Sequence, residues 1–369
     1  MAGETRKILL TGATGFIGGS ILTHLLEPPE SSLKDAQITC LLRGTDRAEK
    51  LSLTYGDRVK PVVYEGLDDL DATTAAAAEH DIVINTTAGH HTRAGVALVE
   101  GLAKRKALTG RDVWILHTSG TSNIGDRPIT KPDVPVRVFD DLVDDTYSYE
   151  KALEAEHAYP QRTAELSVID TGLALGVKTL VIMSPIIYGE GRGIFNKTSI
   201  QTFTHRTAVK RRQVAVVEAG NNIYGHVHIT DLADLYKLAL LDILDSEGQN
   251  LPTGQKGIIF SAHGEHTMIR QAELIAAAGH ELGVFPDRQI QNLGLEEAAW
   301  AVLPHVKVFT EEQIKLAGSQ IVEAILAANA RSVPSVARRL GWKPSKGEDA
   351  WEQSIKDDVR IEAAALGLL

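Results

Sequence analysis

The chain has 369 residues, 43% of them hydrophobic, and a formal net charge of −10 at pH 7. This length predicts a large domain with a smaller companion. The negative charge argues against a general nucleic-acid-binding protein, which needs a basic face for the phosphates. No apolar run reaches the ~20 residues that cross a bilayer, and the polar Met1–Lys7 does not resemble a signal peptide. With Cys40 as its single cysteine, the protein is expected to be cytoplasmic, without a membrane or nucleic-acid partner.

The first half of the chain alternates apolar segments with amphipathic ones. The predicted strands are Lys7–Leu10, Gln37–Leu42, Lys60–Tyr64, Asp81–Asn85, Val113–Thr118 and Thr179–Met183. The predicted helices between them are Gly15–Leu26, Asp71–Glu79, Arg93–Ala107 and Tyr147–His157. Strands separated by helices predict an α/β fold with a doubly wound parallel sheet that is covered on both faces.

The pattern is looser after Tyr188. The elements predicted there are the strands Val214–Val217 and Ile258–Ser261, and the helices Thr198–Arg212, Asp231–Leu244, Thr310–Ala328 and Ser332–Leu340. We therefore predict that residues 1–188 form the sheet domain and that 226–262 return to it. Residues 189–225 and 263–369 are predicted to form a smaller, mainly helical region that binds the substrate.

Three glycines, Gly12, Gly15 and Gly18, follow the first predicted strand and open the first helix. Glycine permits a sharp turn and lets backbone amides approach a pyrophosphate. The helix N-terminus adds unpaired N–H groups and a partial positive charge. The segment predicts a Rossmann-type dinucleotide site, with contacts from Gly12, Thr14, Gly15, Phe16, Ile17 and Gly18.

The end of the second predicted strand bears on the choice of coenzyme. An acidic residue there would accept hydrogen bonds from the ribose of NAD. This chain has Arg43 at that place and Arg47 close behind it, and guanidinium groups suit a 2′-phosphate. We predict NADP rather than NAD, with Asp46 left open as a ribose ligand.

Tyr147 and Lys151 form a Tyr-x-x-x-Lys pair on a predicted helix. This spacing puts both side chains on one face, about one turn apart. A phenol with an unperturbed pKa of ~10 needs a nearby cation to act as an acid–base group near neutrality. We predict that Tyr147 moves the proton while Lys151 lowers its pKa and holds the nicotinamide ribose.

These motifs, in this order, resemble the extended short-chain dehydrogenase/reductase family, which includes NAD(P)-dependent epimerases, dehydratases and dihydroflavonol-type reductases. The segments that carry the resemblance are Thr11–Gly18, Asn85–Ala88, His117–Thr121, Ser184–Gly189, Gly225–Ala233 and Leu340–Pro344. The resemblance implies further coenzyme contacts at Asp68, Thr87, Ala88, Tyr147, Lys151, Pro185 and Ile187. It also implies hydride transfer without a metal, in which a hydroxyl at the end of the fifth strand binds the substrate oxygen.

Two departures from the family pattern affect the expected site. Gly120 stands where the second of two hydroxyl residues is common, so the hydroxyl is expected from Ser119 or Thr121. The helix after the fourth strand starts with Thr92–Gly95 and lacks an asparagine there, which puts a relay through that residue in doubt. His90 and Tyr188 are predicted to contact the substrate.

Two other groups of residues, the histidines of one predicted strand and the serines near residue 120, do not predict a metal site or a hydrolase. His226 and His228 share a strand face, but no cysteine or carboxylate cluster completes a four-ligand set, so we predict no metal site. A serine hydrolase is disfavoured because Ser119–Ser122 lacks the G-x-S-x-G elbow.

The leading functional prediction is an NADP-dependent oxidoreductase that reduces a ketone or aldehyde of a small metabolite. One alternative is a nucleotide-sugar epimerase or dehydratase with tightly bound NAD. A second is a coenzyme-sensing regulator without catalysis, which the Tyr147–Lys151 pair disfavours. The resemblance also implies a homodimer through the helices Arg93–Ala107 and Tyr147–His157.

Overall fold

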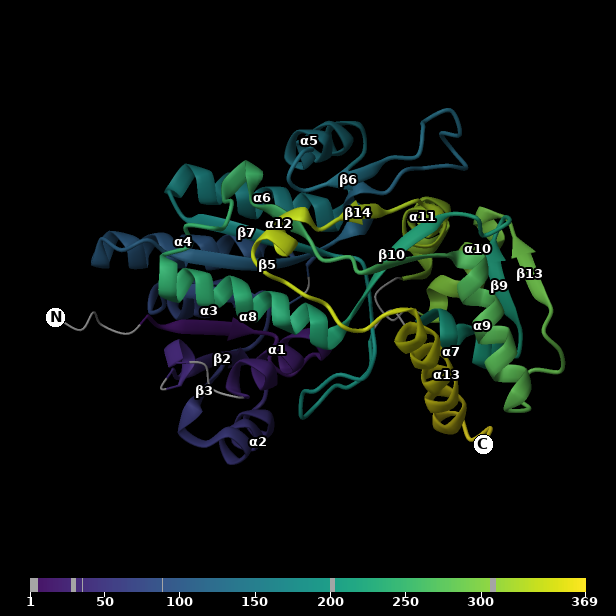
Figure 1. The fold of residues 1–369 in the computed structure, drawn as a ribbon, viewed down its shortest axis with the longest axis horizontal. Coiled ribbons are helices and arrows are strands. Elements are labelled where there is room, and N and C mark those ends of the chain that lie inside the picture. The colour runs from purple at the N-terminus through teal and green to yellow at the C-terminus, as the bar shows by residue number, and fades with distance from the viewer. Residues whose placement is uncertain (1–5, 28–30, 35, 88, 200–202, 306–309) are drawn as a thin grey trace.

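The structure is a computed structural model that describes the chain except residues 1–5, 28–30, 35, 88, 200–202 and 306–309. Its larger part is built on a parallel sheet with the strand order β11-β7-β5-β4-β1-β2-β3 (Figure 1). In that order the strands are β11 (Ile258–Phe260), β7 (Lys178–Ser184), β5 (Trp114–Gly120), β4 (Ile82–Asn85), β1 (Ile8–Thr11), β2 (Ile38–Leu42) and β3 (Val59–Val63). All strands predicted in the first half lie in this sheet, which confirms the predicted α/β fold.

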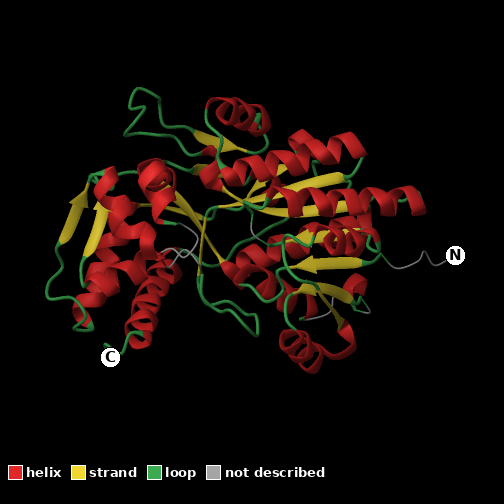
Figure 2. Cartoon of the chain, turned by 180° about the vertical axis from the view of Figure 1, so that it is seen from behind, coloured by secondary structure: helices red, strands yellow, loops and turns green. Residues whose placement is uncertain are grey.

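Each face of the sheet has its own apolar core because successive strand residues point to opposite faces. The helices of this part are α1 (Phe16–Leu26), α2 (Thr45–Tyr55), α3 (Leu70–Ala78), α4 (Thr92–Thr109), α6 (Pro160–Leu175) and α8 (Ile229–Ser246). Along β1, Ile8 and Leu10 pack with residues of α1 and α8. Leu9 points the other way and packs with residues of α4 and α6. Figure 2 shows helices on both sides of the sheet.

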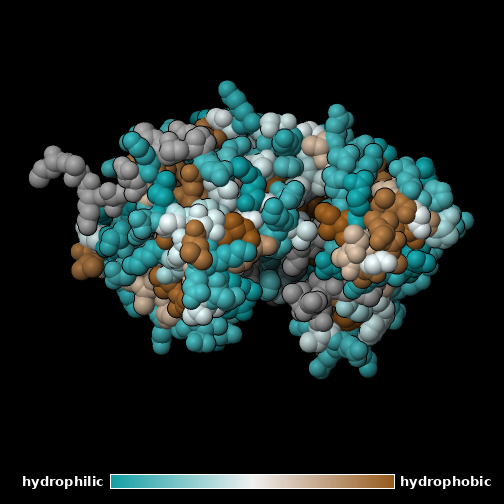
Figure 3. All heavy atoms as spheres, turned by 90° about the horizontal axis from the view of Figure 1, so that it is seen from below, coloured by the Kyte–Doolittle hydropathy of each residue, from teal (hydrophilic) through white to brown (hydrophobic). Residues whose placement is uncertain are grey.

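A smaller, mainly helical region follows a three-stranded link sheet with the order β12-β10-β8. The strands of the link are β8 (Ile186–Tyr188), β10 (Ile223–His228) and β12 (Gly264–Thr267). The smaller region contains α7 (Phe203–Arg211), β9 (Val214–Val217), α9 (Met268–Glu281), β13 (Ile290–Leu293), α10 (Leu295–Val302), α11 (Glu311–Val322), the π-helical η7 (Glu323–Ala327) and α13 (Glu348–Ala365). Seen from below, a notch in the surface separates the two parts (Figure 3).

Short elements complete the chain. They are the 3-10 helices η1 (Ser31–Leu33), η2 (Gly56–Arg58), η3 (Thr121–Ile124), η5 (Gly254–Lys256) and η6 (Leu303–His305), the strands β6 (Val138–Asp140) and β14 (Arg331–Val333), and the helices α5 (Thr146–Glu156) and α12 (Ser335–Arg339). The parallel pairing of β6 with β14 joins two segments that are far apart in the sequence. Within the described residues, no helix is both long and apolar enough to span a bilayer.

Part of the C-terminal segment packs on the large sheet, whereas we predicted that all of residues 263–369 belong to the smaller region. Ala337 and Trp342 are buried in the core shared by α1 and α8. The Trp342 indole N–H donates to the Asp231 carbonyl at 2.7 Å, which satisfies the polar edge of a buried ring. The Asp231 carboxylate accepts the backbone N–H groups of Ser345 and Lys346, each at 3.0 Å, and so holds the segment on α8.

Candidate active site

The glycine turn between β1 and α1 has the geometry that its spacing predicts. Gly12 has a φ of +79°, and a Cβ there would lie 2.5 Å from Thr86 Oγ1. A Cβ on Gly18 would lie 2.3 Å from the carbonyl oxygen of Gly12, which itself accepts the Gly15 N–H at 2.8 Å. No side chain caps the start of α1, so its first amides face the turn. This glycine-lined cradle at a helix N-terminus fits a pyrophosphate.

Polar side chains behind the turn tie three strands together at their carboxyl ends. The Asn85 Oδ1 atom accepts hydrogen bonds from the hydroxyls of Thr11 and Thr87, each at 2.7 Å. The Asn85 amide nitrogen lies 3.0 Å from His117 Nδ1 on β5. Thr87 is therefore placed beside the glycine turn, while the predicted contact at Ala88 lies outside the described residues.

A surface pocket next to the turn holds the residues predicted for the adenosine end. It is lined by Arg43, Glu65, Gly66, Leu67, Asp68, Asp69 and His91. Arg43 follows β2 and lies over Gly66, with no ion-pair partner among the described residues. His91 caps α4 by accepting the Ala94 N–H at 3.2 Å, and its other nitrogen lies 3.3 Å from Asp68. Arg47 is exposed on α2. The pocket brings Arg43 and Asp68 together.

Tyr147 and Lys151 do not lie at the nucleotide edge of the sheet, and this part of the sequence prediction is wrong. The Tyr147 hydroxyl donates to Asp170 at 2.6 Å, and Lys151 Nζ lies 3.0 Å from the same carboxylate. Asp170 is in the second half of α6, which ends just before β7 begins. Tyr147 also meets Gln255 in η5, the turn that leads into the start of β11. The pair thus lies at the amino ends of the strands, opposite the glycine turn.

The error has a physical cause, because a second helix separates α5 from β7. α6 was not predicted, although Pro160 at its first position and Gly176 at its C-cap, with a φ of +69°, are ordinary helix boundaries. α6 rather than α5 directly precedes β7, so its first residues lie at the carboxyl edge of the sheet. The residue in front of it is Tyr159.

Tyr159 begins a short chain of hydrogen bonds at this carboxyl edge. Its hydroxyl donates to Ser122 Oγ at 3.2 Å, and Ser122 donates to Gln161 Oε1 at 2.8 Å. A Cβ on Gly120 would lie 3.0 Å from the Gln161 amide, so this amide covers the position where a hydroxyl side chain was expected. Burial raises the pKa of the Tyr159 phenol against the opposing effects of Ser122 and Arg162. The phenol is therefore protonated at neutral pH.

Ser122 and Gln161 open onto a cavity of about 190 Å³ between the two parts of the molecule. The cavity is lined by Gly120, Thr121, Ser122, Gln161, Ser184, Pro185, Ile186, Phe203, Thr204, Tyr224, Met268, Gln271, Ile325 and Leu326. It includes the predicted residues Thr121 and Pro185. Ser119 is not in this lining, because its hydroxyl accepts from the buried Asn123 side chain at 3.1 Å.

The residues predicted for the substrate are placed differently. Tyr188 donates to the Lys346 carbonyl at 3.0 Å and packs in the core of the smaller region, so it does not line the cavity. His90 lies in the turn before α4, also outside the lining. Ile187 is buried in the core of the large sheet. The prediction that Tyr188 contacts substrate is therefore wrong, since its hydroxyl fixes the C-terminal segment instead.

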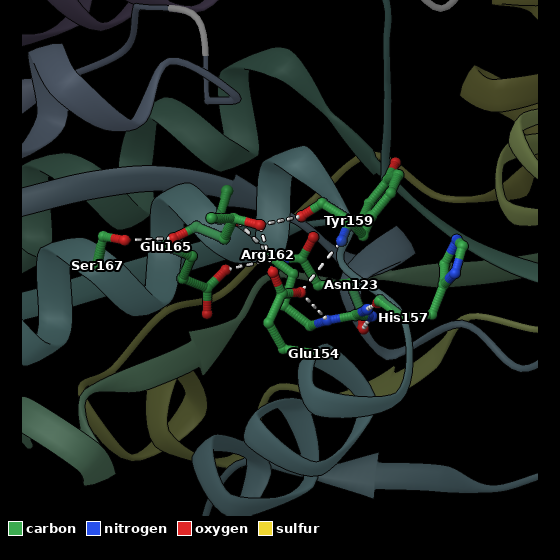
Figure 4. Close-up of polar contacts among 9 residues, drawn as sticks. Asn123, Glu154, His157, Tyr159, Arg162, Glu165 and Ser167 are labelled. Carbon is green, nitrogen blue, oxygen red and sulfur yellow. Dashed lines mark hydrogen bonds and ion pairs between the residues drawn. The ribbon is translucent and has the colours of Figure 1, made fainter. Parts of the chain in front are cut away.

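A buried polar network holds the start of α6 in place (Figure 4). Arg162 forms an ion pair with Glu154 of α5 at 2.9 Å and donates to the carbonyls of Asn123 and His157 at 3.0 and 2.6 Å. Thr163, one helical turn beyond Tyr159, also donates to Glu154. Thr163 thus stands where the Tyr-x-x-x-Lys motif, counted from Tyr159, would have its lysine.

Two carboxyl groups share the interior beneath this network. Glu150 of α5 and Glu165 of α6 are both fully buried. Glu165 accepts from the Asn123 side-chain amide at 2.7 Å. Burial raises the pKa of Glu165 to about 7, and burial next to Glu165 raises the pKa of Glu150 well above its usual value. At least one of the two carboxyls therefore carries a proton at neutral pH.

The histidines of the link sheet are packed rather than arranged as ligands. His226 Nδ1 lies 3.0 Å from His266 Nδ1, and both rings stack on Trp351. Burial lowers the pKa of His226 to about 4 and that of His266 to about 3. Among the described residues, no three His, Cys, Asp or Glu side chains are grouped to hold a metal ion.

Comparison with known proteins identifies the family. The model of the family described as male sterility protein, an NAD-binding family, matches residues 10–89. The curated "Oxidase ucsJ" of Acremonium sp is 30% identical over 377 residues, which cover 99% of this chain and 99% of that protein.

Two solved structures share the fold. The terminal R domain of the myxalamid PKS-NRPS pathway superposes with a TM-score of 0.63 at 15% identity, covering 100% of this chain and 93% of that one. The dTDP-glucose 4,6-dehydratase DesIV of Streptomyces venezuelae, with NAD bound, gives a TM-score of 0.60 at 15% identity, covering 97% and 98%. With the full-length relative and the glycine cradle, these likenesses show that the chain belongs to the extended short-chain dehydrogenase/reductase family of NAD(P)-dependent oxidoreductases.

Proposed function

We propose that the protein is an NADP-dependent oxidoreductase that interconverts a ketone or aldehyde and the corresponding alcohol, with Tyr159 as its proton donor. The observation that carries this proposal is the meeting of the Tyr159 hydroxyl, Ser122 and Gln161 at the carboxyl edge of the sheet. The full-length relative is named an oxidase, which also supports a redox reaction.

The bound nicotinamide would supply the hydride in reduction and accept it in oxidation. The side chains of this protein act on the substrate oxygen. In reduction, the neutral phenol of Tyr159 gives its proton to that oxygen, which becomes a hydroxyl. Ser122 bonds the phenol and orients it, and Gln161 covers Gly120, where its amide N–H can donate to the same substrate oxygen.

Replacing Tyr159 with Phe tests the assignment. We expect kcat to fall by about 100-fold or more, because the proton donor is lost, while NADP binding measured by calorimetry is unchanged. Tyr147→Phe is the matched control, since its hydroxyl binds Asp170 at the opposite edge, and it should keep activity within about threefold. The reverse pattern would return the catalytic role to Tyr147.

The preference for NADP rests on Arg43 in the pocket next to the turn. Its guanidinium has no competing carboxylate in ion-pair contact among the described residues and is free to bind a 2′-phosphate. Arg43→Ala should weaken NADP binding by about 10-fold or more and leave NAD binding within about twofold. Arg47→Ala is the matched control on exposed α2. Equal loss of both coenzymes in R43A would contradict a 2′-phosphate contact.

The alternative function is that of a nucleotide-sugar epimerase or dehydratase, because the solved structure of a dTDP-glucose dehydratase shares this fold. Such an enzyme reduces and reoxidises its coenzyme in one cycle, so it shows no net consumption. We therefore expect stoichiometric oxidation of NADPH at the nicotinamide absorbance when a carbonyl substrate is supplied. Turnover of a nucleotide sugar without net coenzyme change would overturn the reductase proposal.

A further inference from the structure

The cavity at Ser122 borders a second chamber inside the smaller region. This inner chamber, of about 50 Å³, lies among α7, β9, α9 and α10. Thr204, Met268, Gln271 and Leu326 line both spaces and therefore lie between them. Ser122 and Gln161 line the outer cavity but not the inner chamber, and the Tyr159 hydroxyl, which is not in either lining, bonds Ser122. The inner chamber therefore lies on the side of the outer cavity away from these groups.

The walls of the inner chamber are mostly apolar. They include Ala272, Ile275, Leu293, Ala298, Val302 and Val216. Among the described lining residues of both spaces, Arg211 is the single charged side chain, and it already bonds Gln291 at 3.2 Å. A diphosphate seated here would lack the cations that its charge requires. An apolar group that moved from water into this chamber would bind favourably, because burying apolar surface lowers the free energy.

We infer that the substrate is a carbonyl compound with an apolar alkyl or aryl tail, and that the tail extends past the four shared residues into the inner chamber. The inference rests on the proposed function, because Tyr159 and Ser122 define which end of the substrate reacts. With about 10–15 Å³ of such space per water-sized group, the inner chamber of about 50 Å³ accepts about four carbon-sized groups. The outer cavity accepts the reacting carbonyl and the first part of the tail.

Binding of product-like alcohols tests the inference without relying on turnover. Primary alcohols of about four to ten carbons are titrated into the protein with NADP present, and binding is measured by calorimetry. Affinity should rise by about threefold for each added methylene and then level off when the inner chamber is full. Affinity that does not change along the series would overturn the inference.

Two variants locate the tail. Ala272→Leu and Ala298→Leu each add a branched side chain to a different wall of the inner chamber. We expect the increase in affinity to stop about three carbons earlier in both, while short alcohols bind as before. Ala107→Leu on the exposed surface of α4 is the matched control and should bind like the wild type. Identical profiles in all four proteins would place the tail elsewhere.

Thermal unfolding of the two variants shows whether the added leucine side chains fit into the chamber or disrupt the packing around it. If the chamber accepts the added leucine, both variants unfold within a few degrees of the wild type, whereas a filled core would be overpacked and lose about 1–3 kcal/mol. A large loss of stability in both variants would show that the chamber cannot take a tail.

The same series separates this inference from the proposed function. If alcohols bind with the expected dependence on chain length but no aldehyde causes oxidation of NADPH, the reductase function is refuted and the inference about the apolar chamber is retained. Aldehydes that are all reduced with a kcat/KM independent of length would refute the chamber and leave the function standing.

Discussion

Two neighbouring helices, α5 and α6, each have a tyrosine next to their first residue, and the two tyrosines differ in position and partners. Tyr147 is the second residue of α5, with Lys151 one turn later, and both bind the half-exposed Asp170. Tyr159 directly precedes α6, has Thr163 one turn later, and meets Ser122 at the cavity. The motif is thus complete on the helix that faces away from the nucleotide and incomplete on the helix that faces it.

The position of each helix relative to the sheet explains why its tyrosine can or cannot reach the coenzyme edge. In a parallel sheet, the helix that directly precedes a strand begins at the carboxyl edge, where the glycine turn also lies. α6 meets this condition before β7, and α5 does not. The spacing of Tyr147 and Lys151 is favourable, but their position beside η5 separates them from the coenzyme turn.

The largest expected effect is a difference in stability between variants of Arg162 on α6 and Lys151 on α5. Arg162 is buried and binds Glu154 and two carbonyls, so Arg162→Ala leaves a carboxylate unpaired and should lower the free energy of unfolding by about 3–5 kcal/mol. Activity should fall with it, because Tyr159 loses its support. Lys151→Ala removes an exposed ion pair and should cost less than about 1 kcal/mol. Denaturant unfolding measures both, and equal losses would contradict the comparison.

The buried carboxyls predict a pH dependence of stability that belongs to α5 and α6 together. Burial raises the pKa of Glu165 to about 7 in the folded state, while in the unfolded state it is near 4.5. The folded protein therefore holds this proton more tightly, and its contribution to stability is fully present below about pH 4.5. The contribution is lost as the pH rises from there through about 7.

Glu165→Gln isolates this contribution, because an amide does not titrate and still accepts from Asn123. We expect the free energy of unfolding to decline less between pH 5 and 8 in E165Q than in the wild type. Glu150→Gln, at the other member of the pair, should flatten the profile in the same direction. A decline of equal size in all three proteins would show that the pair does not titrate in this range.

The smallest expected effect comes from adding the missing cation. Thr163→Lys places an ammonium one turn from Tyr159, where it favours the phenolate and lowers the pKa of the phenol. Because reduction needs the protonated phenol, the loss of kcat/KM at high pH should move down by about one pH unit. Thr163→Met is the uncharged control. An unchanged pH profile in T163K would indicate that Tyr159 is not the proton donor.

Much of this protein could be predicted from the sequence because its signals are local. The order of strands and helices predicted the doubly wound sheet, and the glycine spacing predicted the turn that Gly12 and Gly18 form. A glycine with a positive φ and a glycine under a carbonyl oxygen are requirements of a few adjacent residues, so they are visible in the chain itself. Arg43 at the end of β2 is visible for the same reason.

The reacting groups could not be predicted in this way, because they are brought together across the fold. Ser122 follows β5, Tyr159 precedes α6, and the inner chamber is closed by segments from α7 to η7. Similarly, Tyr188 resembles a substrate contact by position, yet its hydroxyl binds the Lys346 carbonyl near the C-terminus. The local signals in the chain were enough to predict the sheet, the glycine cradle and the family resemblance. Which tyrosine bonds the cavity-lining Ser122 became clear from the folded structure, because it depends on which edge of the sheet each helix reaches.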